Sequence, residues 1–373
     1  MAVLLRKGLA SDPNNAMLHA KTGYLHLDQY DFEAAAASFE TALRLSPSMD
    51  RARVCLARCY NMLGRPKSAL DVLGEFAGAL YERAQALADI DLVDAAELEF
   101  RATLDGDPHH RHACRRLCQI LRKTQRTSEL LDTCEALAAQ GVCHSQLLYN
   151  WGWALASCGH YDQARRILFD PDRVTQLLLP VPVGFKDLAE FNAALADEIL
   201  TNPHRLGNFA ADEEANRGSK RVEHLFAGSR PDLVQLLLRS LQQLVTDYTP
   251  VPLDGFDPWP RFKPAAAHLK AWGLLQRCGD YEELHIHRGG WLSGVYYVRV
   301  PRSVTGEGDG PGCIEFGPPS GLARELPGFL QSCRWVPREG MLLLAPSHYS
   351  HRTIPTGVDE DRISFAFDVV RDT

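Results

Sequence analysis

The C-terminal part of the chain carries a pattern that is typical of β-strands. From Ala267 onward, short apolar runs are separated by turns that contain Gly and Pro. These runs are rich in Val, Ile, Tyr and Phe, the residues that favour strands, and side chains along a strand alternate between its two faces. The runs read HLKAWGLLQ, YEELHIH, WLSGVYYVRV, CIEFG, MLLLAPS and RISFAFDVV. The pattern therefore predicts a small antiparallel β-barrel.

Three histidines are placed so that they could converge inside this barrel. His285 and His287 stand two apart on a predicted strand, so both imidazoles point to the same side. His351 follows the strongly apolar strand of residues 341–345. Neutral imidazole nitrogens are good metal ligands, so these three residues form a candidate metal site. The alternative for each is a core histidine whose hydrogen bonds are satisfied.

The order of these motifs resembles that of a known family. HxH, SGVYYV, CIEFG, a Gly turn into LLLAPS, a His followed by IP, and RISFAF resemble the double-stranded β-helix of 2-oxoglutarate/Fe(II)-dependent oxygenases. Within that family the chain is most similar to a bacterial branch that is often fused to tetratricopeptide repeats, and it is more distantly similar to prolyl hydroxylases. The resemblance covers roughly the C-terminal half.

The resemblance implies a set of ligands and a chemistry. Fe(II), the cosubstrate 2-oxoglutarate and dioxygen would hydroxylate a substrate C–H bond, with no catalytic side chain beyond the metal centre. Arg362 would bind the far carboxylate of 2-oxoglutarate, because its guanidinium pairs two oxygens at once. Ser364 shares its strand face and Tyr297 would contact the same carboxylate. The alternative for Arg362 is a surface salt bridge with the acids at 359–361.

One position departs from the family pattern. The usual ligand set for this iron chemistry is two histidines and one carboxylate, with HxD or HxE as the first motif. Here the second position is His287. Either three histidines hold the iron, or His285 and His351 bind it together with a nearby acid. Glu283 and Glu315 are the candidate acids.

The N-terminal part of the chain carries a period of 34 residues. Pro13 and Pro47 are 34 apart, and the segment between them has small residues where two helices of a repeat would pack closely, namely Gly23, Ala35 and Ala42. This resembles tetratricopeptide repeats, whose extended concave surface binds partners. The third unit is shifted and the fourth is poor. Residues 2–13 match only the second helix of a unit.

Helical periodicity stops near residue 170, so we predict two domains. Residues 1–170 would form an all-α tetratricopeptide-repeat solenoid, and residues 177–373 a double-stranded β-helix (jelly-roll) barrel braced by helices at 187–200 and 230–248. The polar segment 202–218 is a candidate lid over the site.

Composition sets limits on partners and compartment. The 45% hydrophobic and 23% charged residues are typical of a globular protein. The net charge of -7 lacks the positive excess that is typical of nucleic-acid-binding proteins. No apolar run is long enough to span a membrane. The ten cysteines and the lack of an apolar leader predict reduced thiols in the cytoplasm.

The sequence therefore predicts an iron- and 2-oxoglutarate-dependent dioxygenase that hydroxylates a protein or peptide side chain, with the repeats holding a partner or substrate. One alternative is a repeat scaffold whose barrel binds a metal or ligand without turnover. Another is a cupin, which also uses HxH but normally has a glutamate a few residues later. That reading leaves Arg362 unexplained.

Overall fold

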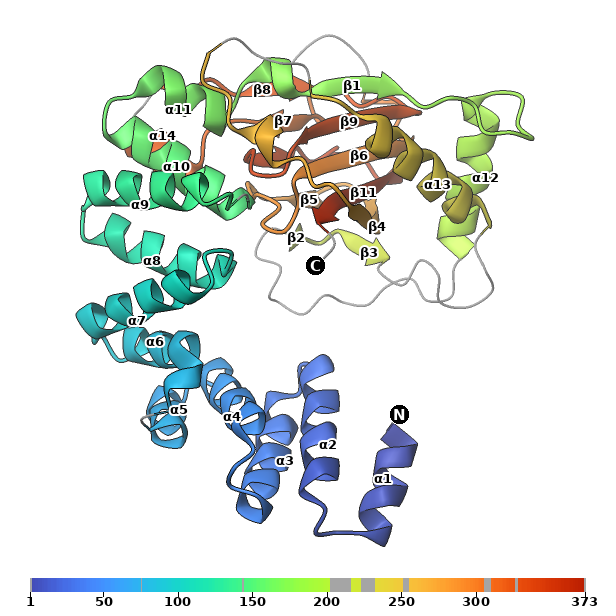
Figure 1. Cartoon of the computed structure of the whole chain (residues 1–373). Coiled ribbons are helices and arrows are strands. Elements are labelled where there is room, and N and C mark those ends of the chain that lie inside the picture. The colour runs from blue at the N-terminus through green and yellow to red at the C-terminus, as the bar shows by residue number, and fades with distance from the viewer. Residues whose placement is uncertain are drawn as a thin grey trace. The chain divides into compact units, whose positions relative to one another are not determined.

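The computed structural model describes residues 2–74, 76–142, 144–201, 216–222, 232–250, 255–304, 310–325 and 328–371 (Figure 1). The chain divides into two compact units, Met1–Arg126 and Thr127–Thr373. Most of the candidate lid, residues 202–215, lies outside the described residues. Among the described helices, none is both long enough and apolar enough to cross a membrane.

The first unit is built of consecutive helices, which confirms the predicted repeats. They are α1 (Ala2–Ser11), α2 (Ala16–Asp28), α3 (Phe32–Leu45), α4 (Asp50–Met62), α5 (Pro66–Leu73), α6 (Leu80–Asp89), α7 (Val93–Gly106) and α8 (Arg111–Lys123), with a short 3-10 turn, η1, at Ala77–Ala79. The small residues act as predicted, because a Cβ at Gly23 would lie 2.7 Å from the ring of Phe39. Even the poorly matching fourth repeat forms a helix, α8, followed by α9 in the second unit.

Three more helices of the repeat type belong to the second unit. They are α9 (Thr127–Ala139), α10 (Ser145–Ser157) and α11 (Tyr161–Leu168). Helix α10 is almost wholly buried, and Ser145 at its start donates a 2.6 Å hydrogen bond to the carbonyl of Gly290. Phe169 stacks on Phe316 in a cluster that includes Tyr349. A division near residue 170 stays a prediction, but these contacts show that α10 and α11 share a core with the strands.

The described strands of the second unit form three antiparallel sheets. A six-stranded sheet has the order β1-β9-β6-β11-β4-β3, a three-stranded sheet the order β10-β7-β8, and β2 pairs with β5. The strands are β1 (Thr175–Leu178), β2 (Asn216–Arg217), β3 (Lys220–Val222), β4 (Ala267–Gln276), β5 (Tyr281–Glu282), β6 (Leu292–Arg299), β7 (Ile314–Phe316), β8 (Cys333–Trp335), β9 (Met341–Pro346), β10 (His351–Thr353) and β11 (Arg362–Arg371). The predicted β-rich domain is confirmed, and the described sheets are not joined into a closed barrel.

Helices cover one face of the large sheet. Helix α12 (Leu188–Thr201) packs on β6, where Tyr296 donates a 2.8 Å hydrogen bond to Asn192, and α13 (Asp232–Asp247) contacts β4. The remaining helical elements are α14 (Ser320–Glu325), η2 (Pro171–Arg173) and η3 (Trp259–Phe262). Because side chains alternate, Tyr297 faces the opposite side from Tyr296, as predicted.

The other face of the large sheet carries the candidate site. Arg362, Ser364, Ala366 and Asp368 alternate along β11 and so share this face. The residues opposite them on the neighbouring strands lie on the same face. These are Gln276, Leu274 and Trp272 on β4, and Tyr297, Val295 and Ser293 on β6. Trp272, Leu274 and Ala366 form an apolar cluster between the two ends of this face.

Candidate metal centre and ligand pocket

The structure brings the three predicted histidines together. His285 pairs with His351 in an isolated antiparallel bridge, with both backbone hydrogen bonds at 3.0 Å. The backbone N–H of His287 donates to the carbonyl of Ser347 at 2.9 Å. One ring nitrogen from each histidine lies within 4.8 Å of the other two. No other group of three potential ligands is this close in the part of the chain that the structure describes.

The hydrogen bonds of the rings determine which nitrogen faces the centre. Nδ1 of His285 lies 2.6 Å from the carbonyl of Glu283, and Nδ1 of His351 lies 3.0 Å from the carbonyl of Tyr349. Nδ1 of His287 lies 2.6 Å from Oδ1 of Asp368. All three partners accept hydrogen bonds, so each Nδ1 carries the proton and each Nε2 keeps its lone pair. This is the tautomer that a metal bound at Nε2 requires.

The surroundings keep the imidazoles neutral and ordered. Burial, together with the neighbouring histidines, holds the pKa of His351 well below its ordinary value. The ring of Trp272 stacks on His287 at 5.6 Å, and Phe316 lies 5.2 Å from the ring of His351. A metal competes with protons for imidazole nitrogen, so a depressed pKa favours metal binding at neutral pH.

Neither acid that the sequence offered as a third ligand lies at the centre. Glu315 faces away from the histidines and pairs with Arg334 and Arg352, at 2.6 and 2.7 Å. Glu283 pairs with Arg217 at 2.8 Å, and only its backbone carbonyl approaches His285. The geometry therefore favours three histidines over two histidines and one of these acids.

A buried cation lies further along the same face of the sheet. Arg362 is 2% exposed, and its Nη1 donates a 2.9 Å hydrogen bond to the carbonyl of Gly312. Among the described residues no carboxylate pairs with it, and its Nε has no hydrogen-bond partner. The predicted alternative of a surface salt bridge is wrong, because Asp361 pairs instead with Arg277.

Tyr297 and Ser364 lie beside this cation. The guanidinium of Arg362 lies 5.4 Å from the centre of the Tyr297 ring. Burial raises the pKa of Tyr297, while the nearby Arg362 charge partly offsets the rise. Its buried hydroxyl has no hydrogen-bond partner of regular geometry in the described part of the chain. Ser364 is buried and is the cross-strand partner of Tyr297.

These groups fit one end of a dicarboxylate. A buried charge without a partner costs several kcal/mol, and an unpaired buried hydroxyl adds about 1–3 kcal/mol. A carboxylate at this end of the face would accept hydrogen bonds from Arg362, Tyr297 and Ser364 together. The site residues thus fit both groups that the sequence implies, a divalent metal at the histidines and an anion at the arginine.

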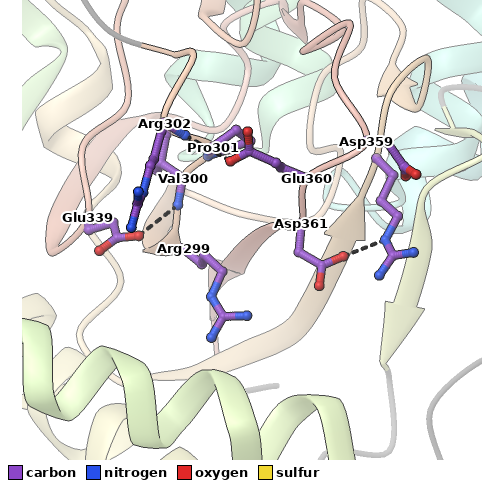
Figure 2. Close-up of a pocket in the computed structure, with 9 residues that line it drawn as sticks. Arg299, Val300, Pro301, Arg302, Glu339, Asp359, Glu360 and Asp361 are labelled. Atoms are coloured by element: carbon purple, nitrogen blue, oxygen red, sulfur yellow. Dashed lines mark hydrogen bonds and ion pairs between the residues drawn. The ribbon is translucent and has the colours of Figure 1, made fainter.

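A surface hollow of about 490 Å³ lies at the strand ends next to Arg362. Its lining residues are Arg277, Arg299, Val300, Pro301, Arg302, Glu339, Asp359, Glu360 and Asp361 (Figure 2). Figure 2 shows Glu339 turned toward the backbone nitrogen of Val300, which donates a 3.1 Å hydrogen bond to it. The acids of this hollow are mostly paired, and none of the histidines lines it. We therefore assign the chemistry to the buried face rather than to this hollow.

Comparison with known families agrees with the geometry. A family model described as "Putative 2OG-Fe(II) oxygenase" matches residues 270–368, which contain the three histidines, Tyr297, Arg362 and Ser364. A tetratricopeptide-repeat model matches residues 26–89. The chain carries a 2OG-Fe(II) oxygenase domain and tetratricopeptide repeats. The sequence matches no curated protein.

Several solved structures are similar to parts of the chain. A prolyl-4-hydroxylase from Pseudomonas putida is 16% identical over 54% of this chain and 94% of its own, with a TM-score of 0.37. A prolyl hydroxylase from Trichoplax adhaerens, solved with a peptide fragment of hypoxia inducible factor, is 13% identical over 58% and 92%, with a TM-score of 0.38. YrrB, a repeat protein with an unusual peptide-binding site, is 19% identical over 44% and 91%, with a TM-score of 0.36.

Two buried residues of the oxygenase domain were not predicted from the sequence. Asp368 accepts the hydrogen bond of His287, and the signal that could have found it is its even spacing from Arg362 along one strand. His348 is also buried. It donates a 2.8 Å hydrogen bond to the carbonyl of Ile167 at the end of α11, and burial lowers its pKa to about 4.

Proposed function

We propose that the chain is an iron- and 2-oxoglutarate-dependent dioxygenase that hydroxylates a side chain of a protein or peptide. The observation that carries this proposal is the pairing of two features on one buried sheet face. Three imidazoles converge at one end, and an arginine without a carboxylate partner among the described residues lies at the other. A metal would bind at the histidines and hold the keto acid end of 2-oxoglutarate. The second carboxylate of 2-oxoglutarate would reach Arg362 at the other end.

Each residue has a defined part in this proposal. His285, His287 and His351 hold Fe(II) through Nε2, and their Nδ1 hydrogen bonds fix the ring orientations. Bound Fe(II) with 2-oxoglutarate and dioxygen supplies the oxidising power for C–H hydroxylation, with succinate and carbon dioxide as co-products. Arg362 holds the far carboxylate in a dry environment, where its charge attracts the ligand more strongly than it would in water.

The strand order supports a jelly-roll arrangement of the domain. In the large sheet β4 and β6 flank β11, and β9 follows β6. Strands β7, β8 and β10 form the three-stranded sheet, here called the small sheet, and β5 pairs with β2. The His285–His351 bridge adds residue 285 to the edge of the small sheet beside β10. Consecutive segments thus alternate between two sheets, which is the pattern of a double-stranded β-helix.

The repeats are proposed to hold a partner, and the charges of the first unit indicate its chemistry. Helices α4, α6 and α8 are the first helices of successive repeats, which line the binding surface of such solenoids. Tyr81 on α6 lies 6.1 Å from His112 on α8. Arg111 and Arg115 lie near His112 on the same helix. These basic side chains would favour an acidic peptide segment.

Binding to the repeats can be tested without knowing the partner. A fluorescein-labelled oligo-glutamate peptide should bind the full chain. Added salt should weaken this binding, because ion pairs between the peptide and arginines on the surface of the repeats are screened. Reversing the charges of Arg111 and Arg115 to Glu should abolish binding, while Arg122→Glu on the same helix serves as the control. Equal binding by all three proteins would contradict an acidic partner.

The cysteines support the predicted compartment. Nine described cysteines are free of disulfides, and most of them are buried. Free buried thiols are typical of proteins kept in a reducing environment, so we propose a cytoplasmic location. Reaction of intact protein with a thiol reagent in cell extracts would test this proposal, since oxidised pairs would not react.

The central experiment is anaerobic titration with Fe(II) and then 2-oxoglutarate. We expect a weak visible charge-transfer band, because a keto acid chelating Fe(II) absorbs there, and succinate formation once oxygen is admitted. His351→Ala should give neither signal. If the wild-type chain binds iron and 2-oxoglutarate but forms no succinate with or without peptides, the scaffold alternative replaces the enzyme.

A further inference from the structure

Asp368 is a buried carboxylate that is hydrogen-bonded to one of the three histidines of the metal centre. It is 8% exposed and lies on β11, on the face that also carries Arg362. Its Oδ1 accepts a 2.6 Å hydrogen bond from Nδ1 of His287 and a 2.7 Å bond from Oγ of Ser293. The hydroxyl of Ser347 lies 2.7 Å from that of Ser293 and completes the chain of donors.

The loop after His287 closes over this network. A Cβ at Gly290 would lie 2.4 Å from Oγ of Ser347 and 3.2 Å from Cβ of Asp368, so only glycine fits there without displacing the serine. The carbonyl of Gly290 in turn accepts the hydrogen bond of Ser145 from α10. Asp368 is therefore held in place from several sides.

When a metal is bound at the histidines, the charge of Asp368 has no full counterpart among the described residues. Its one ion-pair partner among the described residues is His287, whose ring is neutral when Nε2 binds a metal. Lys270, its cross-strand neighbour, is exposed, so water screens its charge. Burying a carboxylate costs several kcal/mol unless another charge compensates for it. A divalent cation on the opposite side of the His287 ring would be that charge.

The three imidazoles differ in this respect. The Nδ1 atoms of His285 and His351 donate to backbone carbonyls, which carry no net charge. Nδ1 of His287 instead donates to a carboxylate, and such a partner makes an imidazole a stronger ligand. Three neutral ligands alone would leave the full charge of a divalent metal in a buried site.

We propose that Asp368 is a positioning residue that supplies, through His287, the negative charge that a set of three histidine ligands lacks. The proposal rests on the proposed function only in that a divalent metal binds at the histidines. It assigns Asp368 no contact with metal, cosubstrate or substrate. Its effect is to orient the His287 ring and to raise the affinity of the site for a divalent cation.

The first test measures metal affinity without turnover. Co(II) is titrated into the metal-free full chain against a chromophoric chelator. Asp368→Asn keeps an acceptor for Nδ1 but removes the charge, and it should weaken Co(II) binding tenfold to a hundredfold. The melting temperature of both metal-free proteins is measured as well, so that a loss of folding is distinguished from a loss of metal affinity. Glu315→Gln, at a buried acid turned away from the histidines, is the control and should leave Co(II) affinity unchanged.

A double-mutant cycle gives a result that a purely structural role would not produce. His287→Asp replaces the imidazole through which Asp368 acts with a carboxylate that can bind the metal directly. In that background Asp368→Asn should weaken Co(II) binding much less than it does in the wild-type background. Such coupling between the two positions would show that Asp368 acts through His287.

The outcomes separate this inference from the proposed function. If Asp368→Asn binds Co(II) within threefold of wild type, or if the change weakens binding equally in both backgrounds, Asp368 has no such role. If Asp368→Asn does not fold, Asp368→Ser replaces it in the same cycle under the same criteria. Tight Co(II) binding that depends on Asp368, without any 2-oxoglutarate binding, would support this inference while refuting the oxygenase.

Discussion

Replacing Arg362 tests the cosubstrate pocket most directly. Arg362 is 2% exposed and donates to the carbonyl of Gly312, and no carboxylate pairs with it among the described residues. If it pairs with the far carboxylate of 2-oxoglutarate, then removing it leaves a buried anion without its partner. Such a loss costs about 3–5 kcal/mol, which corresponds to a weakening of at least about a hundredfold.

The same change should not destabilise the protein when no ligand is bound. In that state Arg362 is a buried cation that lacks an anionic partner, so Arg362→Ala removes a charge that folding had to desolvate and leaves a cavity in exchange. We expect the melting temperature of the ligand-free protein to change little. Arg362→Lys should recover only part of the affinity, because an ammonium cannot pair two carboxylate oxygens in one plane.

The assay is titration of 2-oxoglutarate into protein loaded anaerobically with Fe(II), read by the charge-transfer band or by calorimetry. Arg277→Ala is the matched control, since this arginine lies at the same end of the sheet but is exposed and pairs with Asp361. Its 2-oxoglutarate affinity should equal that of wild type. An unchanged dissociation constant for Arg362→Ala would remove the cosubstrate from this pocket.

Three further predictions follow from the same contacts. His285→Ala and His351→Ala should each abolish stoichiometric iron binding, measured by metal analysis after desalting, and retained iron in both variants would refute the assignment. His348 has a folded pKa of about 4, below its unfolded value of about 6.5, so the unfolded chain binds more protons between these values and stability falls as pH drops through that window. From pH 7.5 to pH 5 the loss is about 2 kcal/mol, and urea unfolding of His348→Gln, which keeps the Nε2-type donor, should lack this part of the pH dependence. A fragment of residues 127–373 should fold and bind iron, whereas residues 177–373 should be less stable by at least about 3 kcal/mol because the core residue Phe169 is missing; equal urea midpoints would contradict this.

The sequence predicts the parts of the fold that depend on local periodicity. Alternation along β11 correctly places Arg362 and Ser364 on one face, and the 34-residue period correctly predicts close helix packing at Gly23. Contacts between distant residues were harder to predict. Nothing local distinguishes Asp368 from a surface acid near the end of a strand, because its role depends on His287, 81 residues earlier. The packing of α10 and α11 on the strands escaped prediction for the same reason.

The face of β11 explains why this ligand set and this cosubstrate would belong together. Asp368 and Arg362 are six residues apart on one strand, roughly 20 Å, which is too far for them to compensate each other. Ser364 and Ala366, which lie between them on this face, carry small side chains. A divalent metal next to Asp368, followed by a doubly charged 2-oxoglutarate that reaches Arg362, would place charges of alternating sign along this face. The charges would be one negative on Asp368, two positive on the metal, two negative on 2-oxoglutarate and one positive on Arg362. Their sum would be zero. Each ligand would then compensate both a charge of the protein and a charge of the other ligand, so the affinity of the site for either one should depend on the presence of the other.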